Sequence, residues 1–107
     1  EQARIAYMIE LELFTKNQSF MEIGVILADV HVAYLAPIYF GERIKVGVHV
    51  LKLGNKSMTW AQNIVDAKTG KVLAKGEVVM VTYDYKEEKT INIPHEWREK
   101  IKAFEGI

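Results

Sequence analysis

The sequence has no cysteine, no net charge and no long hydrophobic segment, and each absence excludes a class of protein. Without cysteine there is no disulfide framework, no thiolate metal site and no cysteine nucleophile, and a cytoplasmic location is expected. The 14 basic and 14 acidic side chains cancel, whereas binding to nucleic acid phosphates usually needs a basic surface, so no nucleic acid partner is expected. Apolar runs such as Ile5–Ile9 are far shorter than a membrane span and no signal-peptide pattern is present, so no membrane insertion is expected.

Half of the 107 residues are hydrophobic, which is typical of a globular protein. A chain of this length buries roughly 65% of its unfolded surface, enough for a core that needs no metal or disulfide. It is too short to hold a second domain of ordinary size. We therefore predict a single domain that spans residues 1–107.

Residues 1–14 contain no glycine or proline and are rich in alanine, leucine, methionine and glutamate, so they are predicted to form a helix. Four polar side chains of this segment point to different sides of the helical wheel: Gln2, Arg4, Glu10 and Glu12. We therefore expect a helix that protein surrounds on all sides. No capping residue precedes Gln2, which indicates that the helix begins before Glu1 and that the chain is incomplete at its N-terminus.

After the polar segment 15–19, the hydrophobic pattern changes to a period of about two and keeps it up to residue 85. This alternation is typical of strands with one buried side. Four strands are predicted: Gly24–Leu35, Arg43–Leu53, Ser57–Asp66 and Lys71–Tyr85. Short connections that contain glycine separate them: Pro37–Gly41, Gly54–Lys56 and Asp66–Gly70. Short connections between consecutive strands favour an antiparallel meander.

A second helix is predicted after Pro94, with Trp97, Ile101 and Phe104 along one apolar stripe and Gly106 at its end. The fold class is therefore α+β. We expect a long helix followed by an antiparallel sheet that curls around it, and a short C-terminal helix.

Two features of the predicted sheet bear on its contacts. Ala28–Leu35 is apolar and free of proline, as expected of an edge strand that pairs with a second copy of the chain, so we predict a homodimer. Gly76 lies on the inward side of the last strand. Its missing side chain either lets a helix approach the sheet closely or marks a simple bulge.

The reactive side chains offer few catalytic candidates. Neither Ser19 nor Ser57 lies in the Gly-x-Ser-x-Gly turn of serine hydrolases. The three histidines show no metal-binding spacing, so no metal site is predicted: His31, His49 and His95.

Two polar groups are candidates for binding. Asp29 and His31 share one side of a strand, a spacing that orients an imidazole in some sites, but two polar residues on a solvated face are the simpler interpretation. The turn Gly54–Ser57 offers backbone N–H groups, an ammonium group and a hydroxyl, which suit a phosphate. A hairpin turn with a solubilising lysine has the same residues, and this interpretation also stays open.

Five segments, in this order along the chain, resemble the motifs of one family. Glu1–Arg4 resembles the Glu-x-Ala-Arg piece of its central helix, and Val30–Glu42 resembles its strand ending in Tyr-Leu-x-Pro and the Phe-Gly-Asp/Glu turn that follows. Val50–Ser57 is similar to its strand and glycine-containing turn, and Asp66–Gly76 and Ile93–Glu96 match in kind. The family is that of the hotdog-fold acyl-CoA thioesterases, in the 4-hydroxybenzoyl-CoA thioesterase-like superfamily.

The resemblance implies a hotdog fold, hydrolysis of acyl-CoA to free acid and CoA, no cofactor, and a site between the subunits of a homodimer or homotetramer. In such enzymes a carboxylate activates water or attacks the thioester directly. The Asp-x-Asp-x-x-Gly-His-type segment that supplies this carboxylate would precede Glu1, so no residue of this sequence is assigned a catalytic role. Asn55, Lys56 and Ser57 are the expected contacts of CoA.

Two alternatives to a thioesterase are open on the same scaffold. One is a noncatalytic protein that binds an acyl ligand or acyl-CoA. The other is a hotdog dehydratase, which is disfavoured because no dehydratase-type Asp/His loop is visible among the strands.

Overall fold

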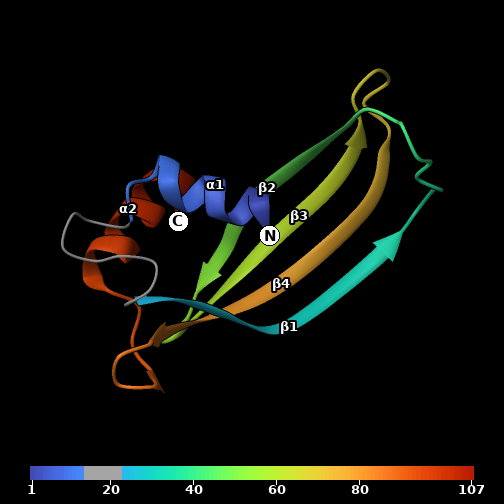
Figure 1. Cartoon of the computed structure of the whole chain (residues 1–107). Coiled ribbons are helices and arrows are strands. Elements are labelled where there is room, and N and C mark those ends of the chain that lie inside the picture. The colour runs from blue at the N-terminus through green and yellow to red at the C-terminus, as the bar shows by residue number, and fades with distance from the viewer. Residues whose placement is uncertain (14–22) are drawn as a thin grey trace.

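Most of the chain forms one curved antiparallel sheet. The computed structural model of the protein describes residues 1–13 and 23–107. Its strands are β1 (Ile23–Tyr34), β2 (Ile44–Leu53), β3 (Ser57–Asp66), β4 (Val72–Asp84) and β5 (Lys89–Thr90). Their order is β1-β4-β3-β2, and the short β5 pairs with β4 (Figure 1). The four long strands confirm the four strands that the alternation in the sequence predicted.

The strand order differs from the predicted meander at β1. The strands β2, β3 and β4 follow one another as antiparallel neighbours, as their short turns indicated. β1 instead pairs with β4, from Ile23 opposite Asp84 to Tyr34 opposite Ala74, so residues 35–43 cross from one edge of the sheet to the other. The meander was wrong here because alternation identifies a strand without identifying its partner. The segment Ala28–Leu35 does lie on an edge, as predicted.

Two helices lie on the concave side of the sheet, α1 (Gln2–Glu10) and α2 (His95–Glu105) (Figure 1). The predicted helix over 1–14 is too long, because the Glu12 N–H donates to the Ile9 carbonyl only three residues back and Glu12 has a φ of 54°. Helix propensity does not predict this end of the helix, since Leu11 and Glu12 both favour helices. Phe14 lies outside the described residues. Among residues 1–13 and 23–107, no helix has the length and apolar character of a membrane span.

One side of α1 is buried and the other is exposed. Tyr7 and Met8 face the sheet and are enclosed, whereas Ala6 and Glu10 are exposed and Ile9 is 62% exposed. The expectation of a helix without a solvent face is therefore wrong for a single chain. The scattered polar residues suggested burial all round, but the curved sheet covers only one side of the helix.

The core lies between the two helices and the middle of the sheet. Its most enclosed side chains come from both layers: Met8, Leu13, Val50, Met58, Trp60, Trp97 and Ile101. Burial of each such side chain contributes about 1.5–3 kcal/mol to stability. Phe104 departs from the predicted stripe, since it is 62% exposed and packs edge-on against Tyr7 with ring centroids 5.6 Å apart. The apolar stripe of α2 thus leaves the core after Ile101.

A carboxylate at the end of α2 joins three elements. Glu105 Oε2 accepts a hydrogen bond from the Tyr7 hydroxyl of α1 at 2.9 Å and from the Val50 N–H of β2 at 2.6 Å. The Val50 N–H is directed out of the strand ladder at a register shift between Val50 and Lys52. Burial, and then the hydrogen bond to Glu105, raise the pKa of Tyr7. The ring of Tyr7 also packs edge-on against Trp60 at 4.8 Å.

The close approach at Gly76 comes from a strand and not from a helix. A Cβ at this position would lie 3.0 Å from the carbonyl oxygen of His31 on the neighbouring β1. Gly76 pairs with Val32 in that ladder. Of the two alternatives, the helix contact is therefore wrong, and the missing side chain makes room for the backbone of β1.

Replacing Tyr7 tests the contribution of the hydrogen bond that Glu105 accepts from it. Tyr7→Phe removes the hydroxyl donor to a carboxylate and is expected to lower the free energy of unfolding by about 1–2 kcal/mol at pH 7. Because the pKa of Tyr7 is raised in the folded state, its contribution is complete below the unfolded tyrosine pKa of about 10 and is lost as the pH rises further. Urea unfolding at pH 7 and at about pH 10.5 measures both effects.

Tyr85→Phe is the matched control, because the exposed Tyr85 hydroxyl donates to the Val25 carbonyl at 3.3 Å. It is expected to change stability by less than about 0.5 kcal/mol. Equal losses in the two variants would contradict a special role for Glu105.

Candidate functional site

A narrow crevice lies between α1 and the strands β1 and β4. Its volume is about 150 Å³. The residues that line it come from three elements: Glu1, Arg4, Ile5 and Met8 along one side of the α1 segment, Val25 and Leu27 on β1, and Met80 on β4. The spacing of the helical residues, i, i+3, i+4 and i+7, places them on one face. The crevice therefore has apolar walls, with charged groups only toward the start of α1.

Arg4 is oriented by the sheet. Its Nη1 donates a hydrogen bond to Gln62 Oε1 on β3, and both residues are half-buried. Since β3 is an inner strand of the sheet, this bond directs the guanidinium toward the sheet centre. The guanidinium group thus lies beside the crevice and does not occupy it.

The predicted CoA contacts lie together in one turn between β2 and β3. The side chains of Asn55 and Lys56 are exposed, and Ser57 is half-buried. The Gly54 N–H donates to the Ser57 carbonyl at 2.8 Å, which closes the turn. The turn therefore presents its polar side chains outward.

The backbone carbonyls of this turn are anchored to the rest of the fold. Arg98 Nη2 donates to the Gly54 carbonyl at 2.6 Å, and the Ile93 N–H donates to the Asn55 carbonyl at 2.9 Å. The Lys56 carbonyl accepts from the Thr82 N–H and hydroxyl, at 2.9 and 3.1 Å. The position of the turn is thus set by β4 and by the start of α2.

The turn and the crevice are not adjacent within one chain. The turn lies at the end of the sheet near α2, whereas the start of α1 lies over its middle (Figure 1). A ligand that contacts both must be extended, or must contact the turn of one copy of the chain and the crevice of another.

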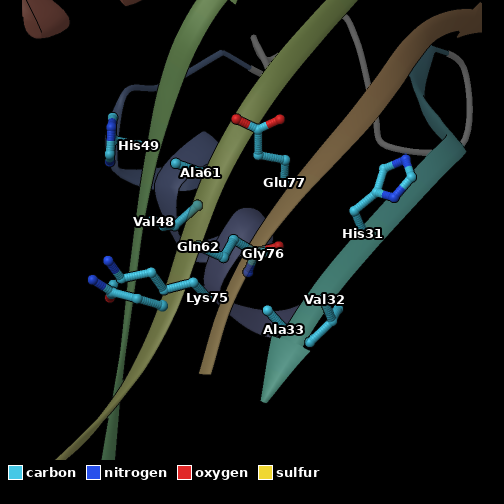
Figure 2. A pocket seen from close by; sticks show the side chains of 12 residues that line it. His31, Val32, Ala33, Val48, His49, Ala61, Gln62, Lys75, Gly76 and Glu77 are labelled. Atoms are coloured by element: carbon cyan, nitrogen blue, oxygen red, sulfur yellow. The ribbon is translucent and has the colours of Figure 1, made fainter. Parts of the chain in front are cut away.

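A larger open hollow of about 840 Å³ occupies the other side of the sheet (Figure 2). Two alternate rows across the four strands line it: His49, Ala61, Glu77 and His31, then Gly47, Asn63, Lys75 and Ala33. The row that lies between these two rows faces the helices, and so do the core residues. The side chains of the two rows therefore point away from the helices. Small residues form the floor and polar side chains surround it.

The histidines occupy separate places. His31 Nε2 lies 3.0 Å from Asp29 Oδ2, and both side chains are mostly exposed, which agrees with a solvated surface pair. His49 lies across two strands from His31, and His95 lies on α2. Within residues 1–13 and 23–107, no three acidic or histidine side chains form a group that could hold a metal ion.

Sequence reasoning missed the residues that position these features. Gln62, Arg98 and Thr82 act through partners that lie 58, 44 and 26 residues away in the chain. No local pattern signals such contacts. The one-sided spacing of Glu1, Arg4, Ile5 and Met8 is the feature of the sequence that could have indicated the crevice.

Comparison with known proteins defines the class. The fold is a helix on the concave side of a curved antiparallel sheet, as in hotdog-fold thioesterases, and the sequence pattern of the Thioesterase-like superfamily matches residues 1–101. The chain belongs to this superfamily. The resemblance noted in the sequence and the predicted hotdog fold are thereby confirmed. No curated protein matches the chain.

Three solved structures illustrate the similarity. The PA5185 protein of Pseudomonas aeruginosa is 25% identical, with a TM-score of 0.81 over 95% of this chain and 70% of its own. A predicted thioesterase from Bacillus stearothermophilus is 27% identical, with a TM-score of 0.75 over 94% and 74%. A thioesterase from Thermus thermophilus, complexed with coenzyme A and Zn, is 31% identical, with a TM-score of 0.68 over 78% and 61%.

Loss of the Arg98 anchor is expected to loosen the turn. Arg98→Met keeps a long side chain but removes the hydrogen bond to the Gly54 carbonyl. Amide hydrogen exchange at residues 54–57 is expected to accelerate about tenfold, which corresponds to about 1.4 kcal/mol of local stability. Lys100→Met, on the same helix, is the control. The same acceleration in both variants would show that α2 acts as a whole and that the Arg98 bond has no separate effect.

Proposed function

We propose that the chain carries the scaffold of an acyl-CoA thioesterase, which hydrolyses an acyl-CoA to the free acid and CoA. The observation that carries this proposal is the match to the Thioesterase-like superfamily over residues 1–101, on a fold shared with solved thioesterases. In the reaction, the oxygen of water bonds to the thioester carbonyl carbon and the carbon–sulfur bond breaks. The CoA thiolate leaves and takes up a proton.

The binding of CoA is assigned to the turn between β2 and β3. The ammonium group of Lys56 suits a CoA phosphate, and the Asn55 amide and Ser57 hydroxyl supply neutral hydrogen bonds beside it. Support comes from the exposure of the Asn55 and Lys56 side chains, with the half-buried Ser57 beside them, on an anchored backbone. The related thioesterase from Thermus thermophilus is described with coenzyme A bound.

The water-activating carboxylate is assigned to a segment before Glu1. The described residues give no competing candidate: near the crevice the only carboxylate is Glu1 itself, which is exposed at the start of α1. We propose that the crevice side of α1 faces the reacting thioester. The residues of this chain then bind and orient the acyl-CoA.

The working form is proposed to be a homodimer, or a tetramer built from such dimers, with β1 at the contact. β1 is an edge strand, and its helix-side residues Val30, Val32 and Tyr34 are 48, 51 and 73% exposed. An apolar, proline-free edge is the surface that a second strand covers most readily. Antiparallel pairing of the two β1 strands would also join the sheets of the two subunits and place residues of both side by side, which suits a site shared between subunits.

Replacing Lys56 tests the assigned phosphate contact. Lys56→Ala is expected to raise KM for acyl-CoA about three- to tenfold with little change in kcat, because a contact to the nucleotide end acts equally in the ground and transition states. The steady-state release of free thiol by the full-length protein measures both constants. The matching acyl-pantetheine, which lacks the nucleotide, is expected to show no change in KM.

Lys68→Ala is the control, since Lys68 is an exposed lysine in the turn between β3 and β4, at the other end of the sheet. A KM for acyl-CoA that stays at the wild-type value in Lys56→Ala would remove Lys56 from the site. Binding of acyl-CoA without turnover of any acyl group, in folded full-length protein, would instead favour the noncatalytic binding protein.

A charge on the edge strand tests the proposed dimer. Val32→Lys places an ammonium group on the helix-side face of β1 and is expected to convert the dimer to a monomer at micromolar concentration, as measured by light scattering. His31→Lys is the control, because His31 is next in the strand and points to the opposite side. A wild-type protein that is already monomeric would exclude the dimer.

A further inference from the structure

We infer that Gln62 is a positioning residue, which holds the start of α1 in place through the hydrogen bond that it accepts from Arg4. In this way it fixes the segment before Glu1, to which the water-activating carboxylate is assigned. This inference rests on the proposed thioesterase function. Gln62 acts through Arg4 and does not itself touch the substrate.

Gln62 breaks the pattern of its strand. The residues of β3 that face the helices are Met58, Trp60, Gln62 and Ile64, and three of them are apolar. An apolar side chain at position 62 would pack against α1 without the cost of removing an amide from water. A polar residue at a position that the alternation assigns to the core indicates a specific contact, and the structure shows that this contact is Arg4.

The first turn of α1 is held less tightly than the last. Tyr7 and Met8 are 7% and 1% exposed and belong to the core, whereas the side chains of Glu1 and Gln2 are exposed. The Tyr7 hydroxyl is also bound to Glu105. Apolar packing therefore fixes the end of the helix and leaves the first turn to other contacts.

Open space lies on both sides of this first turn. A hollow of about 590 Å³ lies between residues 1–3 and Val46 of β2, and the crevice of about 150 Å³ lies toward β1 and β4. Since β3 is the strand between β4 and β2, the first turn stands over it with unfilled space toward each edge of the sheet. Without a contact to β3, the start of the helix can tilt either way.

The bond between Arg4 and Gln62 supplies that contact. Arg4 Nη1 donates to Gln62 Oε1, and both residues are half-buried. Within residues 1–13 and 23–107, no other hydrogen bond or ion pair joins residues 1–6 to the sheet. A hydrogen bond with a charged donor that is partly shielded from water is stronger than a neutral or an exposed one. This one bond thus decides where the first turn lies.

The position of the first turn bears on the reaction and not on the binding of CoA. The segment proposed to precede Glu1 is joined to this turn, so a tilt of the helix start moves the carboxylate relative to the thioester. A displacement of about 1 Å lowers a rate about a hundredfold. The turn assigned to CoA lies at the end of the sheet near α2 and is anchored by Arg98 and Thr82. Loss of the bond is therefore expected to lower kcat and to leave KM.

The experiment measures kcat and KM of the full-length protein by the release of free thiol from acyl-CoA. Gln62→Leu removes the acceptor and is expected to lower kcat about ten- to a hundredfold, with KM within about twofold of the wild-type value. Gln62→Glu keeps an acceptor for the guanidinium and is expected to retain kcat within about threefold. A change in KM alone, or an equal loss of kcat in the two variants, would overturn the inference.

Two further variants separate positioning from a general effect on β3. Asn63→Leu removes the amide of the next residue, which is exposed on the opposite side of the sheet, and is expected to keep the wild-type kcat. Because Gln62 acts through Arg4, the double variant Arg4→Met with Gln62→Leu is expected to lose no more than Arg4→Met alone. Losses that multiply in the double variant, or a matching loss in Asn63→Leu, would contradict the positioning role.

Amide hydrogen exchange gives a readout without turnover. The Ile5 N–H donates to the Glu1 carbonyl at 3.0 Å and closes the first turn of α1. In Gln62→Leu its exchange is expected to accelerate about tenfold, which corresponds to about 1.4 kcal/mol, and in Asn63→Leu to stay unchanged. Unchanged exchange and unchanged kcat in Gln62→Leu would overturn the inference while the thioesterase function stands. Faster exchange in a protein whose wild type hydrolyses no acyl-CoA would overturn the proposed enzyme, and with it the role of Gln62 in catalysis, but would retain the hold on α1.

Discussion

The structure depends on one constraint: a curved sheet with two faces is covered by helices on one face only. α1 supplies that cover, and the hydrogen bonds from Tyr7 and Val50 to Glu105 hold it against the sheet. The side that α1 covers becomes the core and the crevice, while the parts beyond its reach stay apolar and exposed. The placement of a nine-residue helix therefore decides which parts of this face of the sheet are enclosed and which stay exposed.

Much of the fold could be predicted from local patterns because the strands keep a strict alternation. Met58 and Trp60 on β3, and Val78 and Met80 on β4, lie on the buried side that the period of two assigned to them. The partner of β1, the early end of α1 and the outward turn of Phe104 could not be predicted. The first and the last depend on contacts between residues far apart in the chain, and the end of α1 depends on a local backbone turn at Glu12, none of which propensity and periodicity encode.

The candidate site was predictable in composition but not in arrangement. The turn that holds Asn55, Lys56 and Ser57 was recognisable by its glycine and by a resemblance, whereas its anchors Thr82 and Arg98 were not. The crevice is formed by ordinary apolar residues, which have no chemical signature in a sequence. The polar turn can thus be recognised in the sequence, whereas an apolar crevice can be recognised only in the fold.

The crossing connection between β1 and β2 has a consequence for the order of folding. The strands β2, β3 and β4 join through short turns, so their pairing is local and closes quickly, whereas β1 must wait for β4 before it has a neighbour. During synthesis β1 leaves the ribosome well ahead of that neighbour, with both of its edges unpaired. An unpaired strand edge is a template for aggregation, so the speed with which β4 docks on β1 sets how long that edge stays open.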